Sequence, residues 1–534
     1  MTRGPAGKTA TIALCVALAS SLVGTAGAAA VGPTQDLESN GARSGGPSAT
    51  DLAALEESLD APATVPARSF RSTRGDVRGL NWRGCPTDSA PTLLCATLKV
   101  PFDYDHPKRG KFRLAVSKLP ATGVARRSLI FNPGGPGGAG AAAVAGVGSI
   151  VPASIRAKFD IVSWDPRGIG ATRPVLRSCA TPYSVRPISG PVVWSVVRNK
   201  SAANLAKANR LCQQRNARFI NYMGTNNAAR DLDRLRAKVG DSKLTYWGMS
   251  YGTRIGVVYA MLYPNRVRAM VQDGNIDPKG SYAGLTPGGV AADQALGFVR
   301  KLSPASYASL LATRDGLAAA PIDLGGGETF TRWSYLDFMM GVVGAQAQWP
   351  TIDALPSIVN QARVAGAGGD QARGILRTVL AATKSNTNAG GAFSVVNCLD
   401  YKDRMSAARQ RRVVKRNAIA GPVFGGSLTT DYAIGCSGLK VKPDPIPRTR
   451  SKTNRARIAG LKIVIANATK DAATPMRWAK SMANAFPRAA FIKYRGGQHV
   501  IWNNTPSVCV ARHIDPYVRN VKHPRSKTCD FANH

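Results

Sequence analysis

The stretch LTYWGMSYGTRIGVVYAMLY, residues 244–263, decides how the rest of the chain is interpreted. Its first four residues are β-prone, and residues 253–263 place apolar side chains at helical spacing, so a strand is expected to lead directly into a helix. Between them lies the pentapeptide GMSYG (248–252), with Ser250 at its centre. A sharp strand-to-helix turn leaves no room for side chains beside the serine and exposes its hydroxyl. Ser250 is therefore predicted to be a nucleophile; a helix cap rich in Gly and Ser is the alternative.

The sequence around this stretch alternates strand and helix patterns. Strands are expected at 95–100, 112–119, 128–131, 159–164, 244–247, 267–272, 462–466 and 490–494, and helices at 228–239 and 253–263. The alternation is typical of a mostly parallel sheet with helices on both faces. Residues 279–459 interrupt it with Ala-rich helical sequence and Gly-rich turns, so we expect a large helical cap there.

A second motif, NPGGPGG (132–138), follows the strand expected at 128–131. Acyl transfer needs backbone N–H donors for an oxyanion, one from such a loop and one from the residue after the nucleophile. These donors are predicted to be Gly135 and Tyr251. A phosphate-binding loop is the alternative, but no Lys-Ser or Lys-Thr follows the glycines.

A serine hydroxyl needs a base to accept its proton, and the chain has five histidines to supply one. His499 lies in the loop GGQH that follows the strand expected at 490–494. His106 lies in an early turn, and the other three are in the charged tail: His513, His523 and His534. His499 is therefore predicted to be the general base.

The base in turn needs an acid that orients it, and in this kind of fold the acid usually follows the nucleophile and precedes the base. Asp471 fits this order, because it follows the strand expected at 462–466 and precedes a helix that begins near Pro475. The competing residue is Asp273, directly after the strand expected at 267–272. Asp471 is favoured.

The N-terminal sequence indicates processing. Residues 1–30 combine Arg3 and Lys8 with an apolar run and small residues at the end, as a signal peptide does, and residues 31–75 have the composition of a flexible leader or propeptide. The hydrolase core is expected at 76–278 and 460–534, on either side of the cap at 279–459. The protein is predicted to be secreted.

Without Cys15, eight of the nine cysteines remain in the mature chain, an even number that suits an oxidising compartment. They fall into local couples, and the predicted disulfides are Cys85–Cys95, Cys179–Cys212, Cys398–Cys436 and Cys509–Cys529. No metal site is expected, because no Cys-x-x-Cys or cluster of histidines accompanies them.

The chain is strongly basic, with a formal net charge of +40. Loss of the signal peptide would leave +38, because only Arg3 and Lys8 would go with it. The basic residues are dispersed and no nucleic-acid-binding motif appears, so nucleic acid is not an expected partner. No stretch after the N-terminus is apolar enough to span a membrane. Electrostatic association with an anionic cell envelope is expected instead.

The motifs together resemble those of the secreted tripeptidyl aminopeptidases of actinobacteria, relatives of proline iminopeptidases. The resemblance spans roughly residues 80–530 and rests on NPGGPGG (132–138), WDPRGIG (164–170), GMSYGT (248–253), DG (273–274) and DAATP (471–475). It implies an α/β-hydrolase fold and a serine exopeptidase that releases short peptides from free N-termini, with no cofactor. The chain has Ala139 where the family pattern leads one to expect serine, which leaves the argument for backbone donors intact.

The resemblance leaves the substrate open, since similar sequences include esterases and antibiotic-modifying hydrolases. An aminopeptidase must hold the substrate's ammonium group, which calls for a carboxylate in the cap. The candidates are Asp400, Asp403 and Glu328. A secreted carboxylic-ester hydrolase is the second hypothesis, and a non-catalytic envelope-binding protein is the third.

Overall fold

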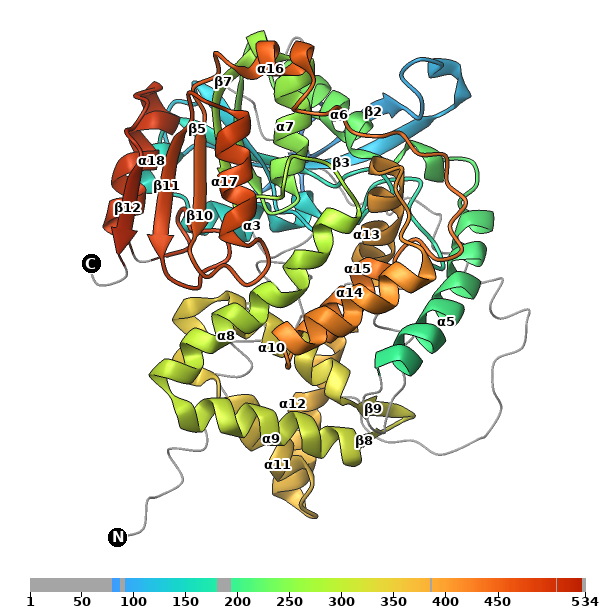
Figure 1. Cartoon of the computed structure of the whole chain (residues 1–534). Helices are drawn as coiled ribbons and strands as arrows, with labels where there is room; N and C mark the ends of the chain where they lie inside the picture. The colour runs from blue at the N-terminus through green and yellow to red at the C-terminus, as the bar shows by residue number, and fades with distance from the viewer. Residues whose placement is uncertain (1–78, 87–91, 180–193, 385–386, 506, 531–534) are drawn as a thin grey trace, which may run out of the picture.

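The structure is a computed structural model and describes residues 79–86, 92–179, 194–384, 387–505 and 507–530 (Figure 1). The signal peptide and leader expected at 1–30 and 31–75 lie outside these residues. The described residues contain a ten-stranded sheet in the order β1-β2-β3-β5-β4-β6-β7-β10-β11-β12, and a separate two-stranded hairpin, β8-β9.

The strands are β1 (Arg83–Gly84), β2 (Leu94–Pro101), β3 (Lys111–Leu119), β4 (Arg127–Asn132), β5 (Phe159–Trp164), β6 (Leu244–Met249), β7 (Val267–Asp273), β8 (Ile322–Gly325), β9 (Glu328–Phe330), β10 (Val464–Ala468), β11 (Ala490–Arg495) and β12 (Lys527–Asp530). The helices of the core are α3 (Gly140–Ile150), α4 (Ala153–Arg156), α5 (Trp194–Arg215), α6 (Thr225–Lys238), α7 (Gly252–Leu262), α16 (Lys452–Ile458), α17 (Met476–Ala485) and α18 (Val508–Asn520). Between β7 and β10 lie α8 (Ala291–Leu302), α9 (Pro304–Ala319), α10 (Arg332–Gly344), α11 (Ala354–Ala362), α12 (Ala367–Lys384), α13 (Thr387–Asp400), α14 (Ala407–Ala420) and α15 (Gly425–Ile434). Short 3-10 turns are η1 (Pro107–Arg109), η3 (Ile220–Tyr222), η4 (Pro264–Arg266), η5 (Ala283–Val290) and η6 (Gln346–Thr351).

The sheet is mostly parallel. Every neighbouring pair from β5 to β12 runs parallel, whereas β1, β2 and β3 are antiparallel additions at one edge. The crossover connections between parallel strands carry helices, which places helices on both faces. The fold class predicted from the sequence is confirmed.

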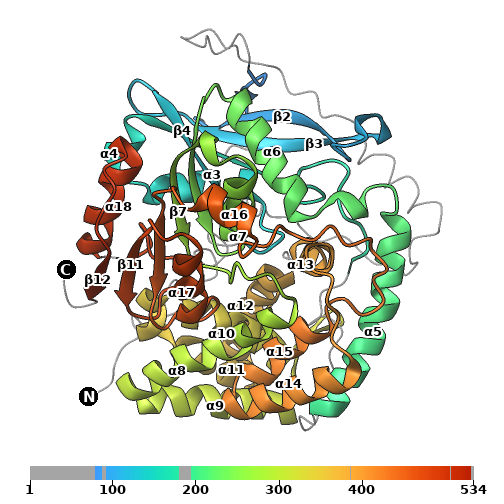
Figure 2. The same cartoon turned by 45° about the horizontal axis from the view of Figure 1, so that its top comes forward.

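Both faces of the sheet are buried against helices (Figure 2). Successive residues of β6 show this, because Tyr246 packs into the core beneath α6, α7 and α17, and Trp247 packs into the core beneath α3 and α18. Every residue of β6 is buried. A strand covered on both faces is mostly apolar, as residues 244–249 are apart from Thr245.

The segment between β7 and β10 covers the edge of the sheet where the parallel strands end (Figure 1). Helices α8 to α12 and the β8-β9 hairpin share a hydrophobic core of their own. Helices α13 and α15 instead pack into the main core with α6 and α7. The name "cap" is used below for residues 279–459, and it therefore includes one part with its own core and one part that joins the main core.

Four disulfides cross-link the described chain, and they are the four expected pairs: Cys85–Cys95, Cys179–Cys212, Cys398–Cys436 and Cys509–Cys529. Cys398 and Cys436 tie α13 to the end of α15 within the cap, and Cys509 and Cys529 tie α18 to β12. Among the described helices, none combines the length and the apolarity that crossing a membrane requires.

Candidate active site

Ser250 lies on the turn between β6 and α7 in a strained backbone conformation. Its φ is +53°, a left-handed value that residues other than glycine rarely adopt. The flanking glycines are required by close packing, since a Cβ on Gly248 would lie 2.6 Å from the Gly252 carbonyl oxygen, and a Cβ on Gly252 would lie 2.6 Å from that of Asn132. The turn therefore has the geometry of a nucleophile elbow.

The glycine-rich loop after β4 lies directly against this turn. Gly134 has a φ of +105°, and a Cβ there would lie 2.7 Å from Ser250 Cβ and 3.2 Å from the Tyr251 nitrogen. The N–H groups of Gly135 and Tyr251 donate to no other residue that the structure describes. Two backbone donors are thus left without a protein acceptor in the neighbourhood of the Ser250 hydroxyl, as an oxyanion hole requires.

Asp471 and His499 meet on the same side of the sheet, at the ends of β10 and β11. His499 Nδ1 lies 2.9 Å from each carboxylate oxygen of Asp471. The Asp471 side chain is fully buried and also accepts hydrogen bonds from the backbone N–H groups of Ala473 and Thr474 and from the Thr474 hydroxyl. These donors hold the carboxylate in one orientation, and the carboxylate in turn fixes which ring nitrogen of His499 carries a proton.

The electrostatic surroundings favour a proton on His499. Burial by itself lowers the pKa of the imidazole, but the charge and the hydrogen bond of Asp471, together with the charge of Asp273, raise it above its usual value. The His499 side chain keeps 24% of its surface exposed. An imidazole with this partner and this access can accept a proton from one group and pass it to another.

Asp273, the competing acid, forms no hydrogen bond with the imidazole among the described residues and instead holds the backbone of the histidine loop. Its two carboxylate oxygens accept the N–H groups of Ile501 and Trp502, each at 2.9 Å. Burial raises the pKa of Asp273 to about 7, although the two N–H donors oppose the shift. This role of Asp273 in holding the histidine loop was not predicted from the sequence, because its position directly after a predicted strand gave no sign of it.

The backbone of Asp273 and Gly274 contacts both the turn that carries Ser250 and the His499 side chain. The Ser250 N–H donates to the Asp273 carbonyl oxygen at 2.9 Å. Gly274 has a φ of +67°, and a Cβ there would lie 2.9 Å from His499 Cε1. The backbone at the end of β7 therefore touches both the nucleophile turn and the imidazole, which explains the Asp-Gly pair seen in the sequence.

The hypothesis that Asp400 binds a substrate ammonium group is corrected by the structure. The Asp400 side chain is fully buried and forms an ion pair with Arg254 at 3.0 Å. Its oxygens also accept the N–H and hydroxyl groups of Thr225, and the Thr225 hydroxyl lies 2.6 Å from that of Tyr251. Asp400 thus braces α7 and the residue after the nucleophile from the cap side, and its oxygens are engaged within the protein.

Asp403 is likewise used within the fold, whereas Glu328 lies elsewhere in the cap. The Asp403 carboxylate accepts the backbone N–H groups of Tyr282 and Ala283, at 2.9 and 3.1 Å, at the start of η5. It therefore serves as a cap for that turn, which sequence spacing did not reveal. Glu328 is half-buried on β9 of the hairpin. Its role as a substrate carboxylate stays a prediction.

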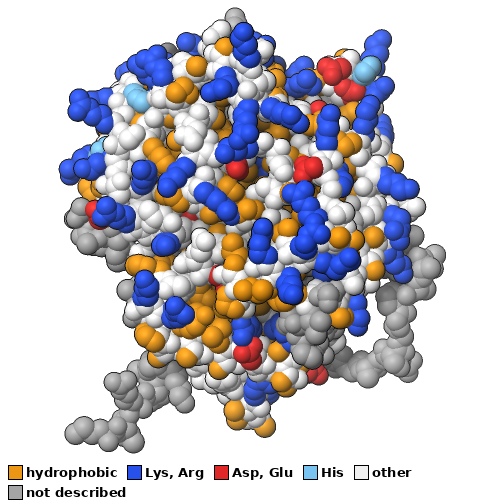
Figure 3. Space-filling model, in the orientation of Figure 1, with side chains coloured by type: hydrophobic (Ala, Val, Ile, Leu, Met, Phe, Trp, Pro, Cys, Tyr) orange, Lys and Arg blue, Asp and Glu red, His pale blue; other side chains and the backbone are white. Residues whose placement is uncertain are grey.

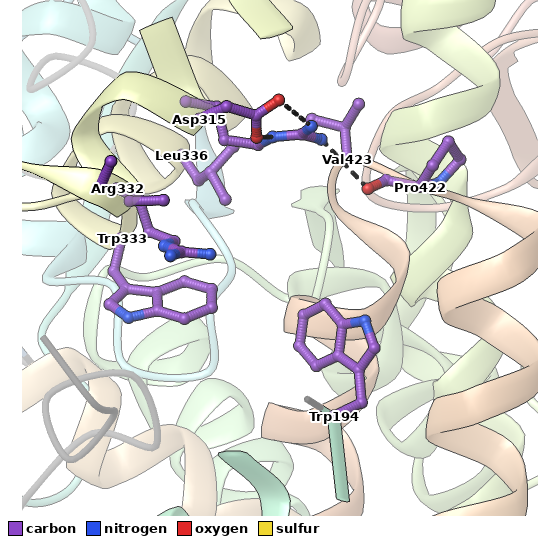
Figure 4. A pocket seen from close by; sticks show the side chains of 10 residues that line it. Trp194, Asp315, Arg332, Trp333, Leu336, Pro422 and Val423 are labelled. Atoms are coloured by element: carbon purple, nitrogen blue, oxygen red, sulfur yellow. Dashed lines mark hydrogen bonds and ion pairs between the residues drawn. The ribbon is translucent and has the colours of Figure 1, made fainter. Parts of the chain in front are cut away.

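A pocket of about 510 Å³ opens inside the cap, where α9, α10 and the α14–α15 connection meet the start of α5 (Figure 4). The indoles of Trp194 and Trp333 form one side, with ring centroids 6.4 Å apart. On the opposite side Arg314 pairs with both oxygens of Asp315. Ser250 and His499 do not line this pocket, so it is separate from the chemistry described above.

One group of potential metal ligands occurs among the described residues: Cys509, His513 and Cys529. The two cysteines form a disulfide with each other, so they cannot bind a metal as thiolates.

The fold and this arrangement define the class of protein. The family model for the α/β-hydrolase fold matches residues 127–502. This match covers more than half of the chain and extends from β4 to the loop that carries His499. The chain belongs to the α/β-hydrolase family and is a hydrolase.

Its relatives narrow the class further. Serine protease Hip1 of Mycobacterium tuberculosis is 30% identical over 462 residues, which cover 80% of this chain and 85% of the relative. Tripeptidyl aminopeptidase of Streptomyces lividans is 35% identical over 220 residues, 39% of this chain and 41% of the relative. Carboxylesterase B of M. tuberculosis is 29% identical over 481 residues, 84% and 88% of the two chains. The resemblance to tripeptidyl aminopeptidases is confirmed, and these relatives support a serine peptidase of the α/β-hydrolase class.

Proposed function

We propose that the protein is a secreted serine exopeptidase that releases short peptides, tripeptides in the first instance, from free N-termini. The observation that carries the proposal is the pairing of a strained Ser250 turn with the hydrogen-bonded Asp471–His499 couple at the ends of neighbouring strands. The relatives named serine protease and tripeptidyl aminopeptidase support the choice of a peptide substrate.

In the first half of the proposed reaction, the Ser250 hydroxyl attacks the carbonyl carbon of the scissile peptide bond while His499 takes the hydroxyl proton on Nε2. Asp471 stabilises the imidazolium through Nδ1. The Gly135 and Tyr251 N–H groups donate to the oxyanion of the tetrahedral intermediate. Collapse of that intermediate breaks the C–N bond, and His499 passes its proton to the leaving amine.

In the second half, water attacks the acyl-enzyme and His499 takes one of its protons. The second tetrahedral intermediate expels the Ser250 oxygen, which regains the proton from His499. The released acid is the short peptide, and the serine returns to its starting state. Every proton transfer uses a residue of the chain, so the cycle needs no cofactor.

A carboxylic-ester hydrolase with the same three residues is the second candidate. It is favoured by one observation, the similarity to Carboxylesterase B of M. tuberculosis over 84% of this chain. The chemistry at Ser250 would be the same, because an ester carbonyl passes through the same tetrahedral intermediates. The two functions differ in whether the cap binds a substrate ammonium group.

Secretion and attachment to an anionic envelope belong to the same proposal. Four disulfides suit an oxidising compartment. Helices α5 and α14 contain no acidic residue, and Arg198 of α5 donates to Gln410 of α14, so the two helices lie side by side. Their exposed basic residues are Lys200, Lys207, Arg210, Arg215, Arg409, Arg411, Arg412, Lys415 and Arg416. Basic side chains are spread over the face that contains α14 (Figure 3), which suits an extended anionic polymer.

The test of the proposed function is N-terminal peptide profiling with the purified enzyme and a Ser250→Ala control. Release of tripeptides from unblocked peptides, with no release from N-acylated ones and none by Ser250→Ala, is the expected result. Turnover of small esters alone, with all free-amine peptides left intact, would replace the peptidase by the ester hydrolase. A fluorophosphonate probe that fails to label Ser250 would contradict both.

A further inference from the structure

The loop that carries His499 touches the cap as closely as it touches the core. A Cβ on Gly496 would lie 2.2 Å from Oε1 of Gln346, and a Cβ on Gly497 would lie 2.2 Å from Cζ2 of Trp349. Both Gln346 and Trp349 belong to η6, the turn that follows α10 in the cap. The two glycines before His499 are therefore required because cap side chains occupy the space beside them.

Three hydrogen bonds join the same two segments. The Gly497 N–H donates to Gln346 Oε1 at 2.8 Å, and the Gln346 N–H donates to Gln498 Oε1 at 3.0 Å. The His499 N–H donates to the carbonyl oxygen of Gly344, the last residue of α10, at 2.7 Å. The backbone donor of the histidine itself is thus satisfied by the cap and not by the core.

These contacts are shielded from water. Gln346 and Gln498 are 7% and 5% exposed, and Trp349 is 7% exposed. The Trp349 indole N–H donates to the Val343 carbonyl oxygen, which holds the ring against the end of α10. Because these groups are buried, removal of an acceptor leaves an N–H group without a partner and is unfavourable.

The core holds the other half of the loop. Asp273 accepts the N–H groups of Ile501 and Trp502, while Val500, between these residues and His499, has a φ of +62°. A β-branched residue rarely adopts a left-handed conformation, so neighbouring contacts must impose it. The position of the His499 backbone therefore depends on two parts of the protein. The core holds the residues that follow His499 in the chain, and the cap holds His499 and the residues that precede it.

We propose that the cap turn from Gly344 to Trp349 is a positioning element for His499 and that Gln346 is its positioning residue, so that the imidazole is aligned with Ser250 only when the cap is seated on the core. The inference rests on the proposed role of His499 as general base. It assigns to the cap a part in catalysis beside substrate choice. A displacement of about 1 Å in such a group lowers the rate about 100-fold.

The experiment compares three variants with the wild-type full-length enzyme. Gln346→Met removes the acceptor of the Gly497 N–H at nearly constant volume, and Gln346→Glu restores an acceptor oxygen. Gln361→Met, on the exposed side of α11, is the matched control within the cap. The readouts are kcat, KM, the pH dependence of kcat/KM and the melting temperature, with a small ester and a free-amine peptide as substrates.

For Gln346→Met we expect kcat to fall about 10- to 100-fold on both substrates, with KM within threefold and a lower apparent pKa for the acidic limb, because His499 loses alignment with Asp471. Gln346→Glu is expected to recover kcat to within about fivefold, and Gln361→Met to match the wild type. The inference is overturned if folded Gln346→Met keeps the wild-type kcat and pH profile, or if its loss of activity only follows a lower melting temperature and disappears on cooling.

If Gln346→Met does not fold, Gln498→Met carries the same expectation, because it removes the acceptor of the Gln346 N–H from the core side. His499→Ala separates this inference from the proposed function. Activity in His499→Ala would contradict the proposed role of that residue, and with it the inference. An inactive His499→Ala beside fully active Gln346→Met and Gln498→Met would overturn the inference alone.

Discussion

The turn that carries Ser250 and the surface of cap helix α8 place glycine under different constraints. At the turn, single backbone contacts under 3 Å dictate residue identity, as at Gly134 and Gly248. In the cap, Gly297 on α8 has no atom within 4 Å of an added Cβ. Where the backbone is crowded, only glycine fits, so a sequence motif there is informative about the structure. A position on a helix surface accepts many residues, so its identity says little about the structure.

The largest expected effect on kcat distinguishes the roles of the two core carboxylates, Asp471 and Asp273. Asp471→Asn should lower kcat about 10⁴-fold, because the imidazole loses both its anionic partner and the correct tautomer. Asp273→Asn should lower kcat only about tenfold, since it disturbs the loop and leaves the Asp471–His499 contact in place. Steady-state kinetics on one ester substrate measures both. An Asp273→Asn variant that loses as much activity as Asp471→Asn would return the role of orienting acid to Asp273.

The next effect tests the contrast in glycines directly. Gly134→Ala should lower kcat about 100-fold or more, because the new Cβ would lie 2.7 Å from Ser250 Cβ and must displace the oxyanion donors. Gly297→Ala is the control, with unchanged kcat and a gain of about 0.5–1 kcal/mol in stability, as expected for a helix interior. Equal activity of the two variants would remove the argument that the glycine loop shapes the site.

A third experiment concerns Asp400, the cap residue that supports the core. Asp400→Asn leaves the buried Arg254 charge without its partner, so urea unfolding should report a loss of about 3–5 kcal/mol. Molecules that remain folded should bind free-amine and N-acylated substrates with an unchanged ratio of KM values. A selective rise in KM for free-amine peptides, with stability intact, would restore the substrate-binding hypothesis for this residue.

A smaller effect is expected on the pH dependence of kcat/KM, at the acidic side of the profile. In the proposed mechanism His499 must be neutral to accept the Ser250 proton. Burial lowers the pKa of His499, but Asp471 and Asp273 together raise it above its usual value of 6.5. The value of kcat/KM should therefore rise with pH through an apparent pKa above 6.5. In Asp471→Asn the residual activity should rise at a lower pH, because the raising charge is gone. An apparent pKa below 6.5 for kcat/KM of the wild-type enzyme would contradict this account.

The smallest effect is expected at Glu328 on the cap hairpin. If this carboxylate holds the substrate ammonium group, Glu328→Gln should raise KM about tenfold for free-amine peptides and leave ester turnover unchanged. Ester and peptide assays with the same enzyme preparation supply the internal control. Equal KM values for wild type and Glu328→Gln on peptides would exclude Glu328 from the substrate site.

Much of the core was predictable from the sequence because its elements are long and apolar. The strands expected at 159–164 and 244–247 appear as β5 and as the first part of β6. β12 (Lys527–Asp530) was missed, since KTCD is a short, charged edge strand without an alternating pattern. The β8-β9 hairpin was missed for a similar reason, because its two strands are very short, are separated only by Gly326 and Gly327, and lie within helical sequence.

The sequence by itself determined the order of Ser250, Asp471 and His499 along the chain, their positions after predicted strands, and the likeness to hydrolases. Local patterns suffice for this, because a nucleophile turn and its glycines are constrained within a few residues. Only the tertiary structure decided what each carboxylate does. Asp400 lies 146 residues from Arg254, and Gln346 lies 151 residues from Gly497, so their pairing depends on how the cap folds back onto the core. No periodicity within a segment records contacts between segments so far apart.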